Sequence, residues 1–124
     1  MILLDSSVLI DLFRKKNKIK SFLFELLDRE SEFAISSITH YEVGIGNKVS
    51  HDEYWSDLTN NLTVIPFDEN CSDAAILIYL DLKRRNQMID LADLFIGSTA
   101  IGYGLPLATL NKKHFERIIG LDVI

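Results

Sequence analysis

Short apolar runs alternate along this chain with longer stretches that carry apolar residues at helical spacing, and this alternation constrains the fold most. Such runs are typical of buried strands, and strands that alternate with helices form crossover units around a parallel sheet. We therefore expect an α/β fold, a three-layer α/β/α sandwich with a central parallel sheet covered on both faces. The expected strands are 1–5, 33–36, 62–67 and 106–109, with 121–124 as a further candidate, and the expected helices are 8–15, 19–29, 37–46, 51–60, 68–86 and 90–104.

Length and composition suit one soluble globular domain that spans residues 1–124. The chain is 48% hydrophobic and 25% charged, which is ordinary for a folded domain and unlike a disordered segment. No apolar run approaches the ~20 residues that a membrane helix needs, so we expect no membrane association. Cys71 is the single cysteine, which excludes an internal disulfide and favours a cytoplasmic location.

Two acidic residues occupy positions where an apolar residue is expected. Asp5 directly follows the apolar run of the first strand, so it lies at the carboxyl end of that strand, where parallel sheets bind their ligands. Asp5 could instead cap the following helix, although Ser6 also offers that function. Glu42 lies between Ile38 and Ile45 at helical spacing, which places it on a face that we expect to be buried, or at the rim of that face.

A third acid lies in an almost wholly apolar helix. Asp93 interrupts the sequence LADLFIGSTAIG, whose composition predicts a buried helix. Asp90, three residues earlier, is placed to cap this helix, and the pair resembles a capping box. Asp93 is therefore compatible with a structural role in the first helical turn, with a functional role, or with both.

These acids come from elements that the expected topology brings to one edge of the sheet. Like charges ~4 Å apart repel by about 4 kcal/mol at an effective dielectric constant of 20, so a carboxylate cluster needs protons or a cation. Oxygen donors without cysteine suit a hard divalent ion, Mg²⁺ or Mn²⁺. Such an ion can activate water and neutralise charge on a phosphate, so the pattern predicts metal-assisted phosphodiester hydrolysis.

Three stretches together resemble a known family. LLDSSVLIDLF, SSITHYEVGIG and DLADLFIGSTAIGYGLPLATLNKKHFERIIGLDVI are similar to PIN-domain ribonucleases and, among them, to the VapC-type toxins of toxin–antitoxin pairs. The resemblance rests on an Asp that ends the first strand, a Glu inside the third helix, Asp-x-x-Ile-Gly at the start of an apolar helix, and Thr-x-Asn-x-x-His-Phe near the end. It extends over residues 1–124, and the order and spacing of the elements carry its specificity.

The resemblance implies roles for individual side chains. Asp5 and Asp93 match metal-binding acids, and Glu42 matches an acid that lies near the metal or holds its water. Ser6 matches a hydroxyl that supports the site, and Thr109 matches the hydroxyl that ends the fourth strand.

Asn111 stands where some members of the family carry a fourth acid. An amide supplies no charge, so the resemblance leaves open whether one or two metal ions bind. We expect Asn111 to orient a water or an aspartate, and Asp90 has no counterpart beyond its capping position.

The resemblance also implies an RNA substrate cut by endonucleolytic hydrolysis, a homodimer, and a small VapB-like antitoxin as a partner. The formal net charge of −5 argues against a general nucleic-acid binder and makes a basic inhibitor physically reasonable. Basic residues nevertheless cluster after the first helix, where Arg14, Lys15 and Lys16 are our candidates for contacts to the RNA backbone. The alternative for this cluster is a solvated helix end.

Other functions remain open at this point. A phosphatase with Asp5 as nucleophile would need a second acid two residues later, where this chain has Ser7. A receiver-like module would need an acceptor acid at the end of another strand, for which Asp68 is the candidate. A PIN scaffold that binds RNA without cutting it is the third alternative.

Overall fold

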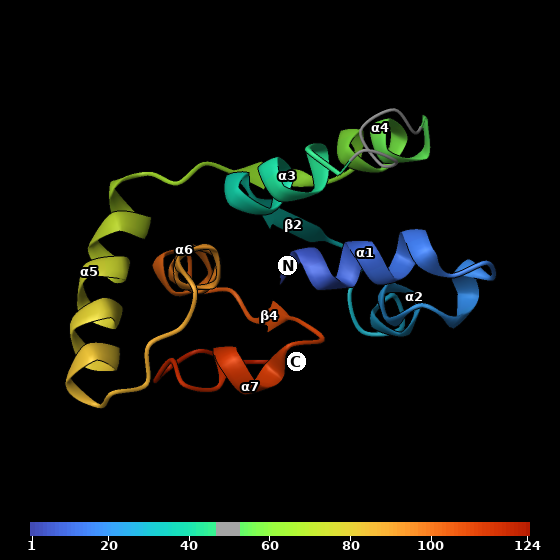
Figure 1. The fold of residues 1–124 in the computed structure, drawn as a ribbon. Helices are drawn as coiled ribbons and strands as arrows, with labels where there is room; N and C mark the ends of the chain where they lie inside the picture. The colour runs from blue at the N-terminus through green and yellow to red at the C-terminus, as the bar shows by residue number, and fades with distance from the viewer. Residues whose placement is uncertain (47–52) are drawn as a thin grey trace.

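The computed structural model describes residues 1–46 and 53–124, and these residues form a parallel sheet with helices on both faces (Figure 1). The first two residues of the helix expected at 51–60 lie outside the described part. The strands are β1 (Ile2–Leu4), β2 (Phe33–Ser36), β3 (Thr63–Ile65) and β4 (Leu107–Ala108). The helices are α1 (Ser6–Arg14), the 3₁₀ helix η1 (Lys18–Lys20), α2 (Phe22–Leu26), α3 (Ser37–Gly44), α4 (Glu53–Asn60), α5 (Glu69–Arg84), α6 (Leu91–Gly102) and α7 (Lys112–Phe115).

The strands lie side by side in the order β3-β2-β1-β4, and every pairing is parallel. Leu3 is in register with Ala34 on one side and with Leu107 on the other, so β1 is central. The candidate strand 121–124 is reduced to a bridge in which Val123 pairs in parallel with Leu107. Strand β1 therefore delivers Asp5 to the middle of the carboxyl edge of the sheet.

Two apolar cores lie on opposite faces of the sheet, because consecutive strand residues point to opposite sides. Ile2 and Leu4 pack with α1 and α2 in one core, whereas Leu3 packs with α5, α6 and α7 in the other. This arrangement confirms the predicted three-layer α/β/α sandwich. No helix among the described residues is long and apolar enough to cross a membrane.

The single helix expected over 19–29 is wrong. The chain forms η1, passes through the buried Ser21, and begins again as the short helix α2. The Ser21 hydroxyl donates to the carbonyl of Lys18 at 2.6 Å, and Asp11 of α1 accepts from the backbone N–H of Phe22 at 2.9 Å. A side chain from another helix thus satisfies the first turn of α2, which periodicity along the segment does not indicate.

Helix α6 crosses close to the C-terminal segment at Gly97. A Cβ atom at this position would lie 2.4 Å from Cδ1 of the buried Ile118, so the two segments pack at a distance that a glycine permits. The same helix begins with Asp93 in its first turn. The close packing of α6 against the chain end therefore sets the position of the third acid relative to the sheet.

Candidate active site

Asp5 lies at the centre of the candidate site, buried with 1% of its surface exposed. It occupies the N-cap position of α1, but its side chain makes no capping hydrogen bond. Its carboxylate instead accepts hydrogen bonds at Oδ2 from Ser7 at 2.7 Å and from Thr109 at 2.8 Å. The capping alternative for Asp5 is therefore wrong, since the buried carboxylate is satisfied by hydroxyl groups.

Residues at the end of β4 hold these hydroxyls in place. The backbone N–H of Leu110 donates to Ser7 Oγ at 3.0 Å, and that of Asn111 donates to Thr109 Oγ1 at 2.9 Å. The hydroxyls of Ser7 and Thr109 lie 3.3 Å apart. The Asn111 residue itself is exposed at the N-cap of α7, where its side chain makes no capping bond.

Ser6 lies between two of the acids. Its hydroxyl is 3.4 Å from Oδ1 of Asp5, and a hydrogen bond from it lowers the pKa of Glu42. The sequence analysis chose Ser6 as the supporting serine, but the shorter bond to Asp5 comes from Ser7. The signal that could have identified Ser7 is the double serine that follows the strand-ending acid.

Glu42 projects from α3 with one carboxylate oxygen, Oε1, buried and without a hydrogen-bond partner within the described residues. Burial raises the pKa of this carboxyl, and the charges of Asp5 and Asp93 raise it further. The face predicted to be buried is interrupted at Ile45, which follows the end of α3 and is exposed. An unpaired buried carboxylate oxygen is costly and normally indicates a missing partner such as water or an ion.

Asp93 lies half-buried in the first turn of α6. Burial is the main cause that raises its pKa, followed by the charge of Asp5. His114 acts in the opposite direction, because its Nδ1 lies 3.3 Å from Oδ2 of Asp93 and it lowers the pKa of that carboxyl. Asp90 occupies the N-cap without a side-chain capping bond, so the capping box does not form.

His114 had no role in the sequence analysis, although it belongs to the Thr-x-Asn-x-x-His-Phe stretch. It lies in the short helix α7, directly before the fully buried Phe115. Only the packing of α7 against α6 brings its ring to Asp93. The structure thus brings Asp5, Glu42 and Asp93 close enough for charges to act between them, with three hydroxyl residues and one imidazole around them.

The donor set fits a hard divalent ion. Mg²⁺ is commonly held by one or two carboxylates and completes its shell with water and substrate phosphate oxygens. Asp5 and Asp93 supply such carboxylates, and the unpaired Oε1 of Glu42 offers an acceptor for a bound water. Across 1–46 and 53–124, no group of three or more His, Cys, Asp or Glu side chains is close enough to hold a metal by itself. The arrangement therefore suits an ion that retains several waters.

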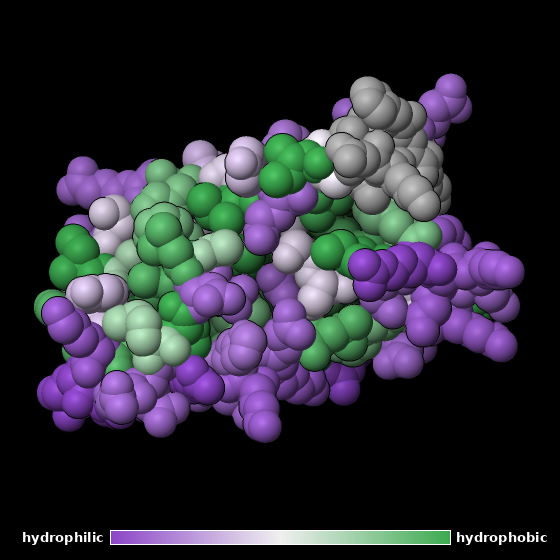
Figure 2. Space-filling view, viewed as in Figure 1, coloured by the Kyte–Doolittle hydropathy of each residue, from purple (hydrophilic) through white to green (hydrophobic). Residues whose placement is uncertain are grey.

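The basic cluster lies at the far end of α1. Arg14 is in the last helical turn, Lys15 is the C-cap residue and pairs with Asp11 at 3.6 Å, and Lys16 follows as an exposed residue. Hydrophilic residues gather over this end of the molecule, whereas hydrophobic residues are prominent over α5 and α6 (Figure 2). The cations are therefore separated from the acids by the length of α1.

Asp68, the acid that a receiver-like module would use, has a structural role instead. Its carboxylate accepts a hydrogen bond from the backbone N–H of Cys71 as the N-cap of α5, and a second one from the hydroxyl of Tyr103. These bonds lower the pKa of Asp68, with the Tyr103 bond as the largest cause.

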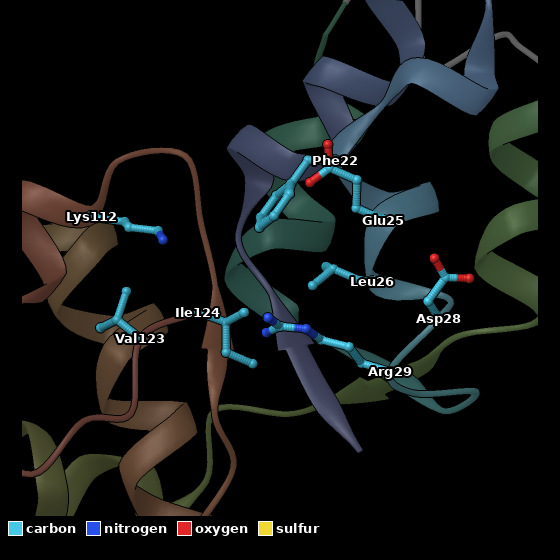
Figure 3. A pocket seen from close by; sticks show the side chains of 8 residues that line it. All are labelled: Phe22, Glu25, Leu26, Asp28, Arg29, Lys112, Val123 and Ile124. Carbon is cyan, nitrogen blue, oxygen red and sulfur yellow. The ribbon is translucent and has the colours of Figure 1, made fainter.

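A hollow of about 540 Å³ has a lining distinct from these acids (Figure 3). It opens between α2 and the C-terminal segment, with Lys112 on one wall and Phe22 and Glu25 on the other. None of the three acids of the candidate site lines it. Its lining residues are Phe22, Glu25, Leu26, Asp28, Arg29, Lys112, Val123 and Ile124.

Comparisons with known proteins identify the family of this chain. The model of the PIN domain family matches residues 2–121. A curated relative, Ribonuclease VapC1 of Methanocaldococcus jannaschii, is 39% identical over 118 residues, which cover 94% of this chain and 80% of the relative. Ribonuclease VapC1 of Rickettsia felis is 31% identical over 99% of this chain and 94% of its own.

Solved structures with the same fold include toxin–antitoxin complexes. A chain of VapBC2 from Rickettsia felis, bound to a DNA fragment from their promoter, is 28% identical with a TM-score of 0.83 and covers 100% of this chain and 98% of its own. A chain of VapBC-1 from nontypeable Haemophilus influenzae is 26% identical with a TM-score of 0.85 over 100% of this chain and 97% of its own.

Proposed function

The chain belongs to the PIN-domain family of VapC ribonucleases, and on this basis we propose that it is a metal-dependent endoribonuclease, the toxin of a toxin–antitoxin pair. The observation that carries the proposal is the buried Asp5, whose side chain makes no capping hydrogen bond and whose charge raises the pKa of Glu42 and of Asp93. Burying a carboxylate among like charges is costly without compensation. A catalytic cation supplies that compensation.

Asp5 and Asp93 would hold one Mg²⁺ or Mn²⁺ ion. When bound, such an ion supplies an acidified water and positive charge beside the RNA phosphate. Ser7 and Thr109 orient the Asp5 carboxylate together with Ser6, and Asn111 orients a water or an acid at the same edge. Hydrogen bonds of this kind to a ligating carboxylate fix its direction and tune its basicity.

Glu42 is placed to accept a proton from the attacking water. The raised pKa of this carboxyl makes it a better proton acceptor than an ordinary glutamate at neutral pH. It takes the proton from the water whose oxygen attacks phosphorus, the phosphodiester P–O bond to the leaving ribose oxygen breaks, and that oxygen takes a proton from solvent to leave as a hydroxyl group. Its unpaired Oε1 is the atom that would accept this hydrogen bond.

The test is cleavage of RNA by the purified protein with Mg²⁺ or Mn²⁺. We expect EDTA to abolish cleavage, and Asp5→Asn and Asp93→Asn each to abolish it while circular dichroism shows a folded protein. Asp90→Asn is the matched control, because this exposed aspartate makes no capping bond and is expected to retain activity. Retained cleavage in both site variants would exclude the proposed roles, and RNA binding without cleavage by the wild type would indicate a non-catalytic scaffold.

A second readout does not depend on activity. Calorimetric titration with Mn²⁺ should show binding to the wild type and to Asp90→Asn. The same titration should show at least tenfold weaker binding to Asp93→Asn, because one ligand is lost. Equal Mn²⁺ affinity in the three proteins would contradict the metal site.

The proposed protein partner is a small VapB-like antitoxin. The solved structures of the same fold are toxin–antitoxin complexes, and the negative net charge of this chain favours a basic inhibitory segment. We expect a small reading frame directly upstream, whose co-expression relieves growth arrest caused by this chain. A toxicity that the upstream product does not relieve would contradict this pairing. A cytoplasmic location follows from the same proposal.

A homodimer is proposed through the outer face of α5. Ile76, Leu77 and Leu80 are 55%, 70% and 57% exposed, which is unusual for three apolar residues on one helix. Light scattering should show a dimer for the wild type and a monomer for Leu77→Lys. The matched control is Ile19→Lys, since Ile19 is 71% exposed on η1, away from this face. Equal masses for the two variants would exclude the α5 face.

The cluster of Arg14, Lys15 and Lys16 is proposed to contact the RNA backbone. Neutralising Lys15 and Lys16 together should weaken RNA binding and flatten its dependence on salt. With fewer phosphate contacts, fewer counterions are released when the RNA binds. Fluorescence anisotropy with labelled RNA in EDTA measures both quantities without cleavage. Unchanged affinity and salt dependence would remove these lysines from the RNA interface.

A further inference from the structure

A second hollow, of about 320 Å³, begins at the candidate active site and extends along α1. Its lining residues are Ser7, Ile10, Asp11, Arg14 and Leu110. Ser7 is the residue whose hydroxyl donates to the buried Asp5, and Leu110 donates to Ser7 through its backbone N–H. The hollow and the acid cluster therefore share a wall.

The helical positions that line this hollow form one continuous stripe. Ile10, Asp11 and Arg14 come three, four and seven residues after Ser7, which are the spacings that share a helix face. Seven residues of α-helix span about 10 Å. The stripe thus leads from the serine beside Asp5 to the guanidinium of Arg14 at the other end.

Charges around the hollow single out Arg14. Lys15 is engaged with Asp11, and Lys18 donates to the carbonyls of Leu12 and Phe13 at the end of α1. Asp11 also accepts a hydrogen bond from the backbone N–H of Phe22 in α2, so its carboxylate is already engaged in contacts within the protein. Arg14 is exposed and makes no ion pair within the described part of the chain.

The remaining walls are apolar and accessible. Ile10 is 37% exposed and Leu110 is 49% exposed, and they flank the hollow from α1 and from the loop after β4. Asp11 also lines the hollow, but its carboxylate is paired with Lys15. The two apolar walls and the arginine at the end of the hollow match a nucleotide, which has an apolar base face and an anionic phosphate. Arginine binds phosphate oxygens with two parallel hydrogen bonds.

We infer that this hollow binds the nucleotide adjacent to the cleaved linkage of the RNA, with Arg14 on its phosphate and Ile10 and Leu110 against its sugar or base. The inference rests on the proposed ribonuclease function and adds a defined subsite to it. Its physical purpose is to offset the repulsion between an anionic strand and the acids, with a cation about 10 Å beyond Ser7 along α1. Arg14 is a positioning residue, since it does not touch the reacting phosphate.

The experiment compares steady-state cleavage of a labelled single-stranded RNA of mixed sequence by the wild type and Arg14→Ala with Mn²⁺. We expect KM to rise about tenfold while kcat changes less than twofold, because one charge-assisted contact to the substrate is lost far from the reacting atoms. The slope of log affinity against log salt, measured in EDTA, should fall by about 0.7. Arg14→Lys should recover part of the loss, because it keeps the charge without the paired hydrogen bonds.

The matched control is Arg84→Ala. Arg84 is an exposed arginine in the last turn of α5 that pairs with Asp81 at 2.8 Å, so this change removes the same charge from the same kind of helix end together with one surface ion pair. A role of Arg14 limited to the helix dipole would lower Tm in both variants and leave KM unchanged, which would overturn the inference. Unchanged KM together with weakened antitoxin binding would also overturn it and assign the hollow to the partner protein.

Failure of this inference is distinguishable from failure of the proposed function. A wild type that cuts RNA while Arg14→Ala behaves like Arg84→Ala refutes the subsite alone. A wild type that cuts no RNA with either metal removes the proposed function, and the subsite with it.

Discussion

Replacing Glu42 by glutamine should stabilise the protein in the absence of divalent ions. Glu42 has a buried carboxylate oxygen without a partner, and its pKa is raised first by burial and then by the charges of Asp5 and Asp93. Glu42→Gln keeps the size of the side chain and removes the charge. A buried unsatisfied polar group costs about 1–3 kcal/mol, and more when charged, so removing the charge of this partly exposed carboxyl should recover about 1–2 kcal/mol.

The effect should depend on pH with a defined sign. A carboxyl whose pKa is raised by folding binds more protons in the native state, so stability falls as pH rises above its ordinary value of 4.5. Wild type and Glu42→Gln should therefore be about equally stable at pH 4.5 or below. The variant should gain progressively as pH rises through the raised pKa of Glu42 and remain ahead at pH 8.

The assay is thermal unfolding by circular dichroism in EDTA between pH 4 and 8. For a chain of this size, 1–2 kcal/mol corresponds to an increase in Tm of about 3–8 °C. Glu116→Gln is the control, since Glu116 is exposed at the end of α7. Saturating Mn²⁺ should raise the Tm of both proteins, because both keep Asp5 and Asp93, and should narrow the gap, because the bound ion also offsets the charge of Glu42 in the wild type. A variant that is no more stable than the wild type at pH 8, or a gap that is independent of pH, would refute the reasoning.

Three further changes test the surroundings of the acids. Thr109→Val removes the 2.8 Å hydrogen bond to Asp5 and should lower kcat about 10–100-fold, whereas Thr109→Ser should retain most activity. Equal kcat values for Thr109→Val and the wild type would contradict the orienting role of Thr109. His114→Ala removes a neighbour that lowers the pKa of Asp93, so the acid limb of the pH–rate profile should move to higher pH. An acid limb at the same pH as in the wild type would show that the 3.3 Å contact does not affect the titration of the active enzyme. Gly97→Val should cost about 1–3 kcal/mol in urea unfolding, because a Cβ there would lie 2.4 Å from the neighbouring isoleucine; an unchanged midpoint would show that this packing relaxes freely.

Several features of this protein can be predicted from the sequence because they depend on local patterns. The alternation of short apolar runs with helical periodicity is sufficient for the parallel three-layer arrangement, since each strand must be buried on both faces. Acids at the end of β1 and at the start of the apolar helix α6 stand out because a carboxylate is improbable there. The sequence therefore singles out Asp5 and Asp93, and helical spacing from Ile38 adds Glu42.

Other features were decided by tertiary structure alone, because they depend on atoms that are distant in the chain. Thr109 donates to Asp5 across 104 positions, and His114 reaches Asp93 only because α7 packs against α6. The helix expected over 19–29 breaks since Asp11 of another helix satisfies the start of α2. Periodicity shows which side chains are apolar, but desolvation and hydrogen bonding between segments decide which polar groups meet, and these are properties of the packed chain.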